Sequence, residues 1–233
     1  ADAIKVHIDI DASEMSKNIP MDFEIVGDAG EILDRLLEKL EQQSHPQWSQ
    51  ELLTFRAQNP IPGMARNKGV DARRVLAAVK NIGGDDTIVV TDVGQHQMIT
   101  AQHYNFSKPR TFLSSLGLGT MGYGLGAAIG AKIGCPDQAV ALITGDGCFH
   151  MNMNELAAAV TEELPLVIII MNNGVLGMVR QWQRLFFKSH YSATTLNRKT
   201  DYVKLAQAMG ATGYQITTNE EITPTLEKAF SSK

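Results

Sequence analysis

The stretch AVALITGDG at residues 139–147 is an apolar run that leads directly into a glycine–acid–glycine turn. A second stretch of the same kind, LVIIIMNNG, lies at residues 166–174. Continuous apolar runs of this length are typical of parallel strands that are buried on both faces. We therefore expect strands at 139–144 and 166–171, each followed by a polar loop at its carboxyl end.

Helices and further strands are expected to alternate with these two runs. Apolar spacing, glycine stops and capping residues predict helices at 71–80, 122–133, 176–187 and 202–209. Capping boxes predict two more, one after Asn152 with Glu155 and one near the C terminus with Thr218 and Glu221. Other strands are expected at 87–91 and 214–216. This order indicates an α/β fold, with a parallel sheet covered by helices on both faces.

The first part of the chain has a different character. Residues 4–10 alternate between apolar and polar and predict a strand, residues 25–26 predict a second one, and a helix is expected from residue 27. Prolines and polar residues at 42–68 predict a linker that carries at most a short helix. We therefore expect the tail of another domain at 1–41, a linker at 42–68 and one α/β domain at 69–233.

Composition excludes several classes of partner. The net charge is −4 and no basic block is present, so no nucleic-acid partner is expected. The longest apolar stretch, residues 164–171, is interrupted by Pro165 and is too short to span a membrane. Cys135 and Cys148 do not form a disulfide framework, which favours a cytoplasmic location. The chain opens on Ala1 rather than on a methionine, so we expect a processed or cut chain.

Three polar loops follow strands of the expected sheet: Asp92–His96, Gly145–Gly147 and Asn172–Gly174. Because loops at the carboxyl ends of parallel strands lie together, we expect them to form one ligand site. Asp146 and Asn173 offer the carboxylate and amide oxygens that Mg²⁺ binds, and phosphate and water oxygens would complete its shell. The glycines beside the acid let the backbone approach a phosphate, and the following helix contributes N–H groups. The sequence therefore predicts a magnesium–diphosphate site.

Two simpler interpretations compete with this one. Each turn alone is commonly only structural, but the pairing, with 24 residues between Gly147 and Asn172, favours a shared site. The run Gly117–Gly122 also fits a dinucleotide fingerprint, which requires an acid at the end of the next strand. Asp137 precedes that strand and Asp146 lies in the phosphate-type turn, so the nicotinamide-dinucleotide interpretation is the weaker alternative.

The paired motif resembles the signature of thiamine-diphosphate enzymes. Three further stretches, TDVGQHQM at 91–98, GLGTMGYG at 117–124 and GMVRQWQ at 177–183, resemble the acetolactate synthase (acetohydroxyacid synthase) family. The resemblance runs from about residue 3 to residue 230 and is weakest in the linker. It implies the thiamine-diphosphate-binding fold with a domain of the PP type at 69–233, and a first part that ends a central FAD-type domain.

The resemblance also implies roles for individual residues. The metal ligands would be Asp146, Asn173 and the backbone carbonyl of Val175. The cofactor-binding residues would be Gly94, Gln95, His96, Gly119, Met121, Gly145, Gly147, Cys148 and Met178. Met178 and Trp182 would line the pocket for a second 2-oxo acid, and ordinary core packing is the alternative for Met121, Met178 and Trp182. Ile99, Gly126 and Cys148 depart from the family pattern without removing a ligand.

The activity implied is that of a transferase that decarboxylates pyruvate and joins the two-carbon unit to a second 2-oxo acid, in branched-chain amino acid biosynthesis. The catalytic glutamate of the family lies in an N-terminal domain without a counterpart here, so no catalytic residue is assigned and no turnover by this chain alone is expected. Most of the FAD site would also be missing. Expected partners are a homodimer or higher homo-oligomer, the N-terminal half and a regulatory subunit. Alternatives are another thiamine-diphosphate enzyme (oxidase, decarboxylase or glyoxylate carboligase) or a non-catalytic cofactor-binding module.

Overall fold

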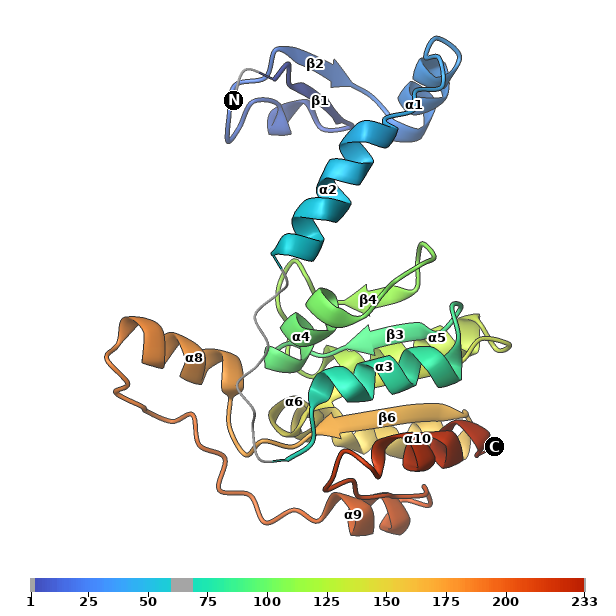
Figure 1. The fold of residues 1–233 in the computed structure, drawn as a ribbon, viewed down its shortest axis with the longest axis vertical. Helices are drawn as coiled ribbons and strands as arrows, with labels where there is room; N and C mark the ends of the chain where they lie inside the picture. The colour runs from blue at the N-terminus through green and yellow to red at the C-terminus, as the bar shows by residue number, and fades with distance from the viewer. Residues whose placement is uncertain (1–2, 60–68, 233) are drawn as a thin grey trace. The chain divides into compact units, whose positions relative to one another are not determined.

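The computed structural model describes residues 3–59 and 69–232 and divides into two compact units, Ala1–Gly63 and Met64–Lys233. Figure 1 shows the elements of each unit. The division falls inside the predicted linker, of which residues 60–68 lie outside the described part of the chain. The assignment of residues 1–41 to the tail of an FAD-type domain remains a prediction.

The first unit has a parallel strand pair and two helices. Strand β1 (Val6–Asp9) pairs with β2 (Phe23–Val26), after the short 3-10 helix η1 (Ala12–Glu14). Helix α1 (Ala29–Leu37) begins where Asp28 accepts a hydrogen bond from Glu31 N at 3.1 Å. Helix α2 (Pro46–Gln58) has 13 residues, so the expectation of at most a short helix in the linker was wrong. A proline in the first turn of a helix is favourable, because the N–H that it lacks would have no partner there.

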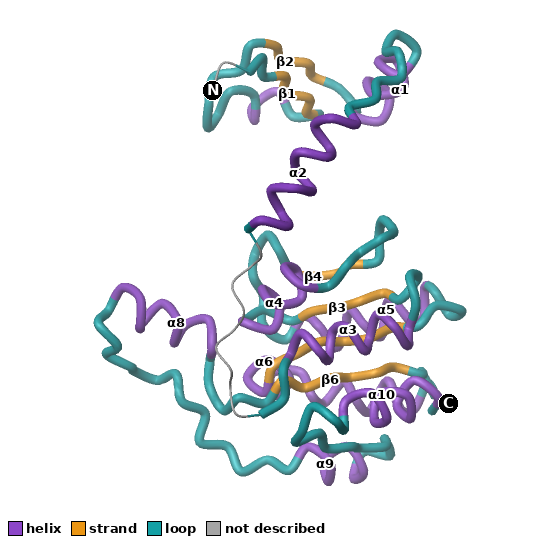
Figure 2. The backbone as a smooth tube through the Cα atoms, viewed as in Figure 1, coloured by secondary structure: helices purple, strands orange, loops and turns teal. Residues whose placement is uncertain are grey.

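The second unit contains a four-stranded, all-parallel sheet (Figure 2). Its strand order is β4 (Phe112–Ser114), β3 (Ile88–Thr91), β5 (Val140–Gly145) and β6 (Leu166–Met171). Every residue of β3 and β5 is buried. Chain order differs from spatial order, because β4 pairs with one edge of β3 and β5 pairs with the other. The chain reaches each successive strand through a helical crossover, as parallel pairing requires.

Helices cover both faces of this sheet. On one face α3 (Ala72–Gly83) and α10 (Ile222–Ser231) pack around Val89, Ala141 and Ile143. On the other face α5 (Tyr123–Gly134), α7 (Leu156–Thr161) and α9 (Tyr202–Ala208) pack around Val90 and Leu142. Alternate residues of β3 and β5 thus enter opposite cores. The predicted α/β class, with a parallel sheet covered on both faces, is confirmed.

The remaining elements follow the carboxyl ends of the strands. Helix α4 (Gln95–His103) follows β3, α6 (Asp146–Asn152) follows β5 with the 3-10 helix η2 (Met153–Glu155) after it, and α8 (Gly177–Phe186) follows β6. The sequence patterns did not indicate α4 or β4. Among the described residues, no helix is both long and apolar enough to cross a bilayer.

Two local predictions were wrong. Residues 214–216 form no strand, and directly after them the Glu221 carboxylate accepts from the N–H groups of Thr217 and Thr218. Glu221 is the N-cap residue of α10, without a capping bond from its own side chain. The bond from Thr218 N to its carboxylate, at 3.1 Å, is one half of the box expected of Thr218 and Glu221. Asn152 makes no capping box, since its amide donates instead to Gly122 O at 2.6 Å. At Asn152 a local capping pattern was thus replaced by a contact 30 positions away.

The first testable consequence concerns the core. Leu142 on β5 is 1% exposed, so Leu142→Ala removes buried methyl groups and leaves a cavity. We expect a loss of about 2–5 kcal/mol in the free energy of unfolding, measured by urea denaturation. Leu118→Ala is the matched control, because Leu118 is 95% exposed and should change stability by less than about 0.5 kcal/mol. Similar losses for the two variants would contradict this assignment of the core.

Candidate functional site

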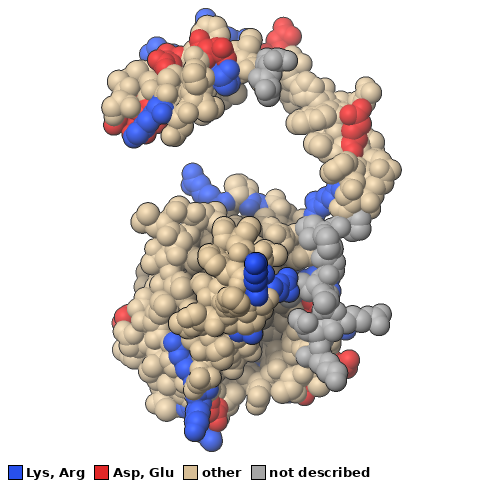
Figure 3. Space-filling model, turned by 90° about the vertical axis from the view of Figure 1, so that its left-hand side faces the viewer, with Lys and Arg blue, Asp and Glu red and all other residues tan. Residues whose placement is uncertain are grey.

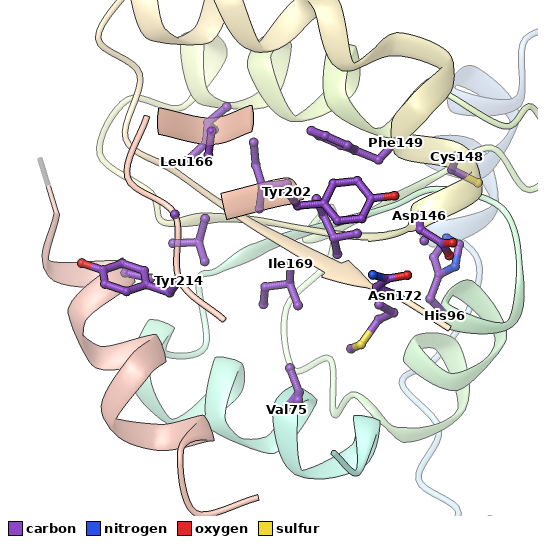
Figure 4. Close-up of a pocket in the computed structure, with 18 of the residues that line it drawn as sticks. Val75, His96, Asp146, Cys148, Phe149, Leu166, Ile169, Asn172, Tyr202 and Tyr214 are labelled. Atoms are coloured by element: carbon purple, nitrogen blue, oxygen red, sulfur yellow. The ribbon is translucent and has the colours of Figure 1, made fainter. Parts of the chain in front are cut away.

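The three polar loops meet at one edge of the sheet, at the carboxyl ends of β3, β5 and β6. A cavity of 2070 Å³ opens there and continues along β6. Figure 4 shows His96, Asp146, Cys148 and Asn172 together at one end of it, with Tyr214 lying away from them. Every residue that the sequence analysis assigned to the metal, the cofactor or the second substrate lines this cavity, except Trp182.

Asp146 and its neighbours are packed tightly. Asp146 is the first residue of α6 and is 3% exposed. A Cβ added at Gly147 would lie 2.8 Å from Leu176 Cδ2 and 3.7 Å from the Met121 methyl carbon. A side chain at this position would therefore displace Leu176 on the loop after β6 and would contact Met121.

The loop after β6 is held in place by a segment from further along the chain. Leu176 N donates to Thr194 O, and Leu196 N donates to Gly174 O, both at 2.8 Å. Within the loop, Asn173 Oδ1 accepts from Val175 N at 3.0 Å. An amide oxygen has two lone pairs, so this bond leaves Asn173 able to accept or coordinate once more.

His96 is the buried polar side chain that lacks a partner at this site. It is 8% exposed, and its Nε2 atom has no hydrogen-bond partner among the described residues. Burial lowers the pKa of His96 to about 4, against the opposing influence of Asp92. The ring is therefore neutral near pH 7. A buried polar atom without a partner is costly, so Nε2 is suited to a polar ligand group.

Cys148 is also uncharged. Its Sγ donates to Val93 O at 3.1 Å, and burial raises the pKa of the thiol to about 11. The side chain beside Asp146 therefore adds no negative charge to the site near neutral pH.

Asp92 joins the loops to each other. Its carboxylate is 1% exposed and accepts from Gly122 N at 2.9 Å, from Gly124 N at 3.0 Å and from the Thr144 hydroxyl at 2.7 Å. These bonds hold the start of α5, just after Met121, against β3 and β5. They also argue against a dinucleotide site. The pyrophosphate of a dinucleotide would need N–H groups of this glycine-rich turn, and these already donate to Asp92.

Helix α8 contributes Met178 to the cavity wall and carries Trp182 outside it. Trp182 is 57% exposed and packs on Phe186, with ring centroids 5.1 Å apart. The alternative that Trp182 is a core residue is therefore wrong in this structure. Its place in a substrate pocket remains a prediction.

Two further residues lie near the acidic turn without a role assigned from the sequence, although Asn172 belongs to a loop expected at the site. Arg198 Nη1 donates to Asp146 O at 3.0 Å across 52 positions of the chain. The Asn172 side chain lies on the same side of the cavity as Asp146 in Figure 4. The position of Arg198 follows no pattern that would predict it, whereas Asn172 belongs to the motif that pointed to its neighbour Asn173.

Comparison with known proteins agrees with this geometry. The family profile described as "Thiamine pyrophosphate enzyme, C-terminal TPP binding domain" matches residues 92–233, which include all three loops. The chain belongs to the thiamine pyrophosphate enzymes. Thiamine pyrophosphate is another name for thiamine diphosphate. The cofactor that the family profile names is therefore the cofactor predicted from the sequence.

The chain is similar over nearly its whole length to the large subunits of several acetolactate synthases. The chain is 38% identical to the acetolactate synthase isozyme 3 large subunit of Escherichia coli, over 98% of this chain and 41% of that protein. It is 43% identical to the acetolactate synthase large subunit of Corynebacterium glutamicum, over 98% of this chain and 38% of that protein. A similar subunit of Haemophilus influenzae is 39% identical, over 98% of this chain and 41% of that protein. The chain thus spans about two fifths of the length of these relatives.

The second testable consequence concerns Asp92. Asp92→Ala leaves two buried N–H groups and one hydroxyl without their acceptor, so we expect a loss of about 3 kcal/mol or more in the free energy of unfolding. Asp92→Asn keeps one oxygen acceptor and should lose less. Asp137→Ala, at an exposed position, serves as the control. Chemical denaturation measures all three, and an unchanged stability in Asp92→Ala would refute the role given to this carboxylate.

The third concerns His96 and pH. The pKa of His96 is about 4 in the folded chain against an ordinary value of 6.5, so between these values the unfolded chain binds the additional proton. Stability from this group is therefore present above pH 6.5 and is lost as the pH falls toward 4, by about 3 kcal/mol in total. His96→Gln should flatten that part of the stability–pH curve, measured by denaturation at a series of pH values. An equal slope in both proteins would contradict the buried neutral imidazole.

Proposed function

We propose that this chain forms the thiamine-diphosphate-binding part of an acetolactate synthase. The complete enzyme would decarboxylate pyruvate and transfer the two-carbon unit to pyruvate or 2-oxobutyrate, in the synthesis of branched-chain amino acids. The observation that carries the proposal is the meeting of the acidic turn after β5 and the Asn172–Gly174 loop after β6 in one cavity. The identity of 38–43% with acetolactate synthase large subunits over nearly the whole chain supports the reaction type.

The residues at this edge fit a diphosphate with Mg²⁺. Asp146 is buried and forms no ion pair with another described residue, so a cation would balance its charge. Asn173 Oδ1 has a lone pair to spare, and the Val175 carbonyl would be the third protein ligand. Mg²⁺ commonly takes few protein ligands and shares phosphate oxygens. Within the residues described, no cluster of three or more acids, histidines and cysteines forms an alternative metal site.

The unpartnered Nε2 of His96 would face the diphosphate. It would donate to a phosphate oxygen only in the tautomer that carries the proton on Nε2, in which Nδ1 no longer donates to the Asp92 backbone. The thiol of Cys148, kept protonated by burial, would contact the diphosphate without repelling it. Backbone groups would make the other contacts that we propose for the cofactor, at Gly94, Gln95, Gly119, Gly145 and Gly147.

Thiamine diphosphate, when bound, supplies the nucleophilic thiazolium carbon at which 2-oxo acids lose carbon dioxide. This chain would orient that group and keep water away from it. Met121, against the acidic turn, would support the bound cofactor, and Met178 would form an apolar wall. Together with Trp182, Met178 would face the second 2-oxo acid, because apolar side chains keep water out of the pocket.

The remaining catalytic groups of the complete enzyme would lie in parts outside the two fifths that this chain covers. We propose that the glutamate that protonates the aminopyrimidine, and most of the FAD site, belong there. The enzyme would be a cytoplasmic homodimer or higher homo-oligomer with a regulatory subunit, and this chain alone would form no acetolactate. Oxidases, decarboxylases, glyoxylate carboligases and non-catalytic modules are the competing functions, and the acetolactate synthase relatives favour the carboligase.

The fourth testable consequence is a metal-dependent cofactor site. In isothermal titration calorimetry, this chain should bind thiamine diphosphate with Mg²⁺ present and lose that binding in EDTA. Asp146→Ala should abolish binding, because the diphosphate and the metal would lose their charged protein ligand. Asp137→Ala again provides the matched acid-to-alanine control and should bind normally. Equal affinity with and without EDTA would overturn the site assignment.

A further inference from the structure

One pair of glutamines connects α8 to the loop after β3. Gln95, the first residue of α4, donates from Nε2 to Gln181 Oε1 at 3.0 Å, across 86 positions of the chain. Gln181 lies four residues after Gly177 on α8, so the two share one face of the helix. A Cβ added at Gly177 would collide with Gln95 Oε1. The amide of Gln95 therefore occupies the space that any side chain at Gly177 would need.

A second glutamine, Gln183, connects α8 to a different segment of the chain. Gln183 Nε2 donates to Ser192 O at 2.9 Å, and the Thr194 hydroxyl donates to Gln183 Oε1 at 3.1 Å. These bonds reach the segment that follows α8 and not the loops at the ends of β3 and β5. Helical geometry places Gln183 about 160° around the axis from Gln181, so the two glutamines hold α8 from different sides.

The apolar residues of α8 lie on a third face. Met178 and Trp182 are one turn apart and project together, with Met178 in the cavity wall and Trp182 beside it. The orientation of this face depends on the rotation of α8 about its axis. Gln181 is the glutamine that connects α8 to the segment with Gly94 and His96. Its hydrogen bond to Gln95 therefore ties the rotation of α8 to the position of that segment.

We propose that Gln181 is a positioning residue, through which the cofactor loop fixes the orientation of the Met178–Trp182 face. The proposal rests on the proposed function, since it takes a diphosphate at the loops as the event that is transmitted. A ligand that fixes the Gly94–His96 loop also fixes the Gln95 amide, and Gln181 is hydrogen-bonded to that amide. Binding at the polar end of the cavity thereby sets the wall that would face the second 2-oxo acid.

The experiment uses Trp182 as the reporter. The chain has two tryptophans, Trp48 and Trp182, so Trp48→Phe leaves Trp182 alone. This reference protein is titrated with thiamine diphosphate and Mg²⁺, with fluorescence and calorimetry in parallel. Calorimetry reports binding, and Trp182 emission reports the state of α8. We expect a saturable change in emission with the same Kd as the heat signal.

Two variants then break the connection in different ways. Gln181→Met removes the acceptor while keeping the length of the side chain. Gly177→Ala displaces the Gln95 amide while leaving Gln181 intact, and alanine favours a helix more than glycine does. Both should lose the emission change while the calorimetric Kd stays within about threefold of the reference value. Loss of response in Gly177→Ala cannot be ascribed to a weakened helix.

Gln183→Met is the matched control on the same helix. It breaks the attachment to residues 192–194, so it should lower stability yet keep the emission change. Retained response in Gln181→Met and Gly177→Ala would overturn the proposal, as would binding heat in the reference protein without any change in emission. Absence of binding heat in the reference protein would instead refute the proposed function, and the inference would fall with it.

Discussion

The buried carboxylate of Asp92 is the contact on which the arrangement of the site depends. It lies at the end of β3 and accepts hydrogen bonds from the first turn of α5 and from the Thr144 hydroxyl on β5. Two strands and a helix are thereby fixed at the edge where the polar loops emerge. A carboxylate buried to this extent is tolerable only because several donors surround it. Met121 and the acidic turn are held close together by this network.

At the polar end of the cavity, Asp146 supplies the carboxylate. Burial keeps His96 neutral and Cys148 protonated at ordinary pH, and the Asp92 carboxylate is already bonded to three donors. The polar end of the cavity therefore presents one carboxylate, with neutral donors and acceptors and with the Arg198 guanidinium on the Asp146 backbone oxygen. This combination suits a cation that carries an anionic ligand. Elsewhere, on the face drawn in Figure 3, Lys and Arg side chains are separated by uncharged surface, in line with the small net charge of the chain.

Elements with strong local patterns were predictable from the sequence. The apolar run at 166–171 coincides with β6, and the helix predicted at 176–187 differs from α8 by one residue at each end. The prediction of a strand at residues 214–216 was wrong, because an apolar pattern carries no information about contacts such as those of Glu221. The candidate site was predictable in outline, since parallel strands bring their carboxyl ends to one edge. Three contacts of the site were not predictable from the sequence, because the two residues of each lie 30, 52 and 86 positions apart. They are Asp92 with Gly122, Arg198 with Asp146 and Gln95 with Gln181.

The strand order has a consequence for handling the protein. β6 is the last strand of the sheet, is built from Leu, Val, Ile and Met, and pairs on one side with β5. The strand at the opposite edge, β4, has only three residues, which is a common protection against unwanted strand pairing. β6 has twice that length and carries neither a charge nor a proline. Among the described residues no strand pairs with its other edge, so the carboxyl-terminal elements that contact β6, such as α10, cover an edge that could otherwise template strand pairing.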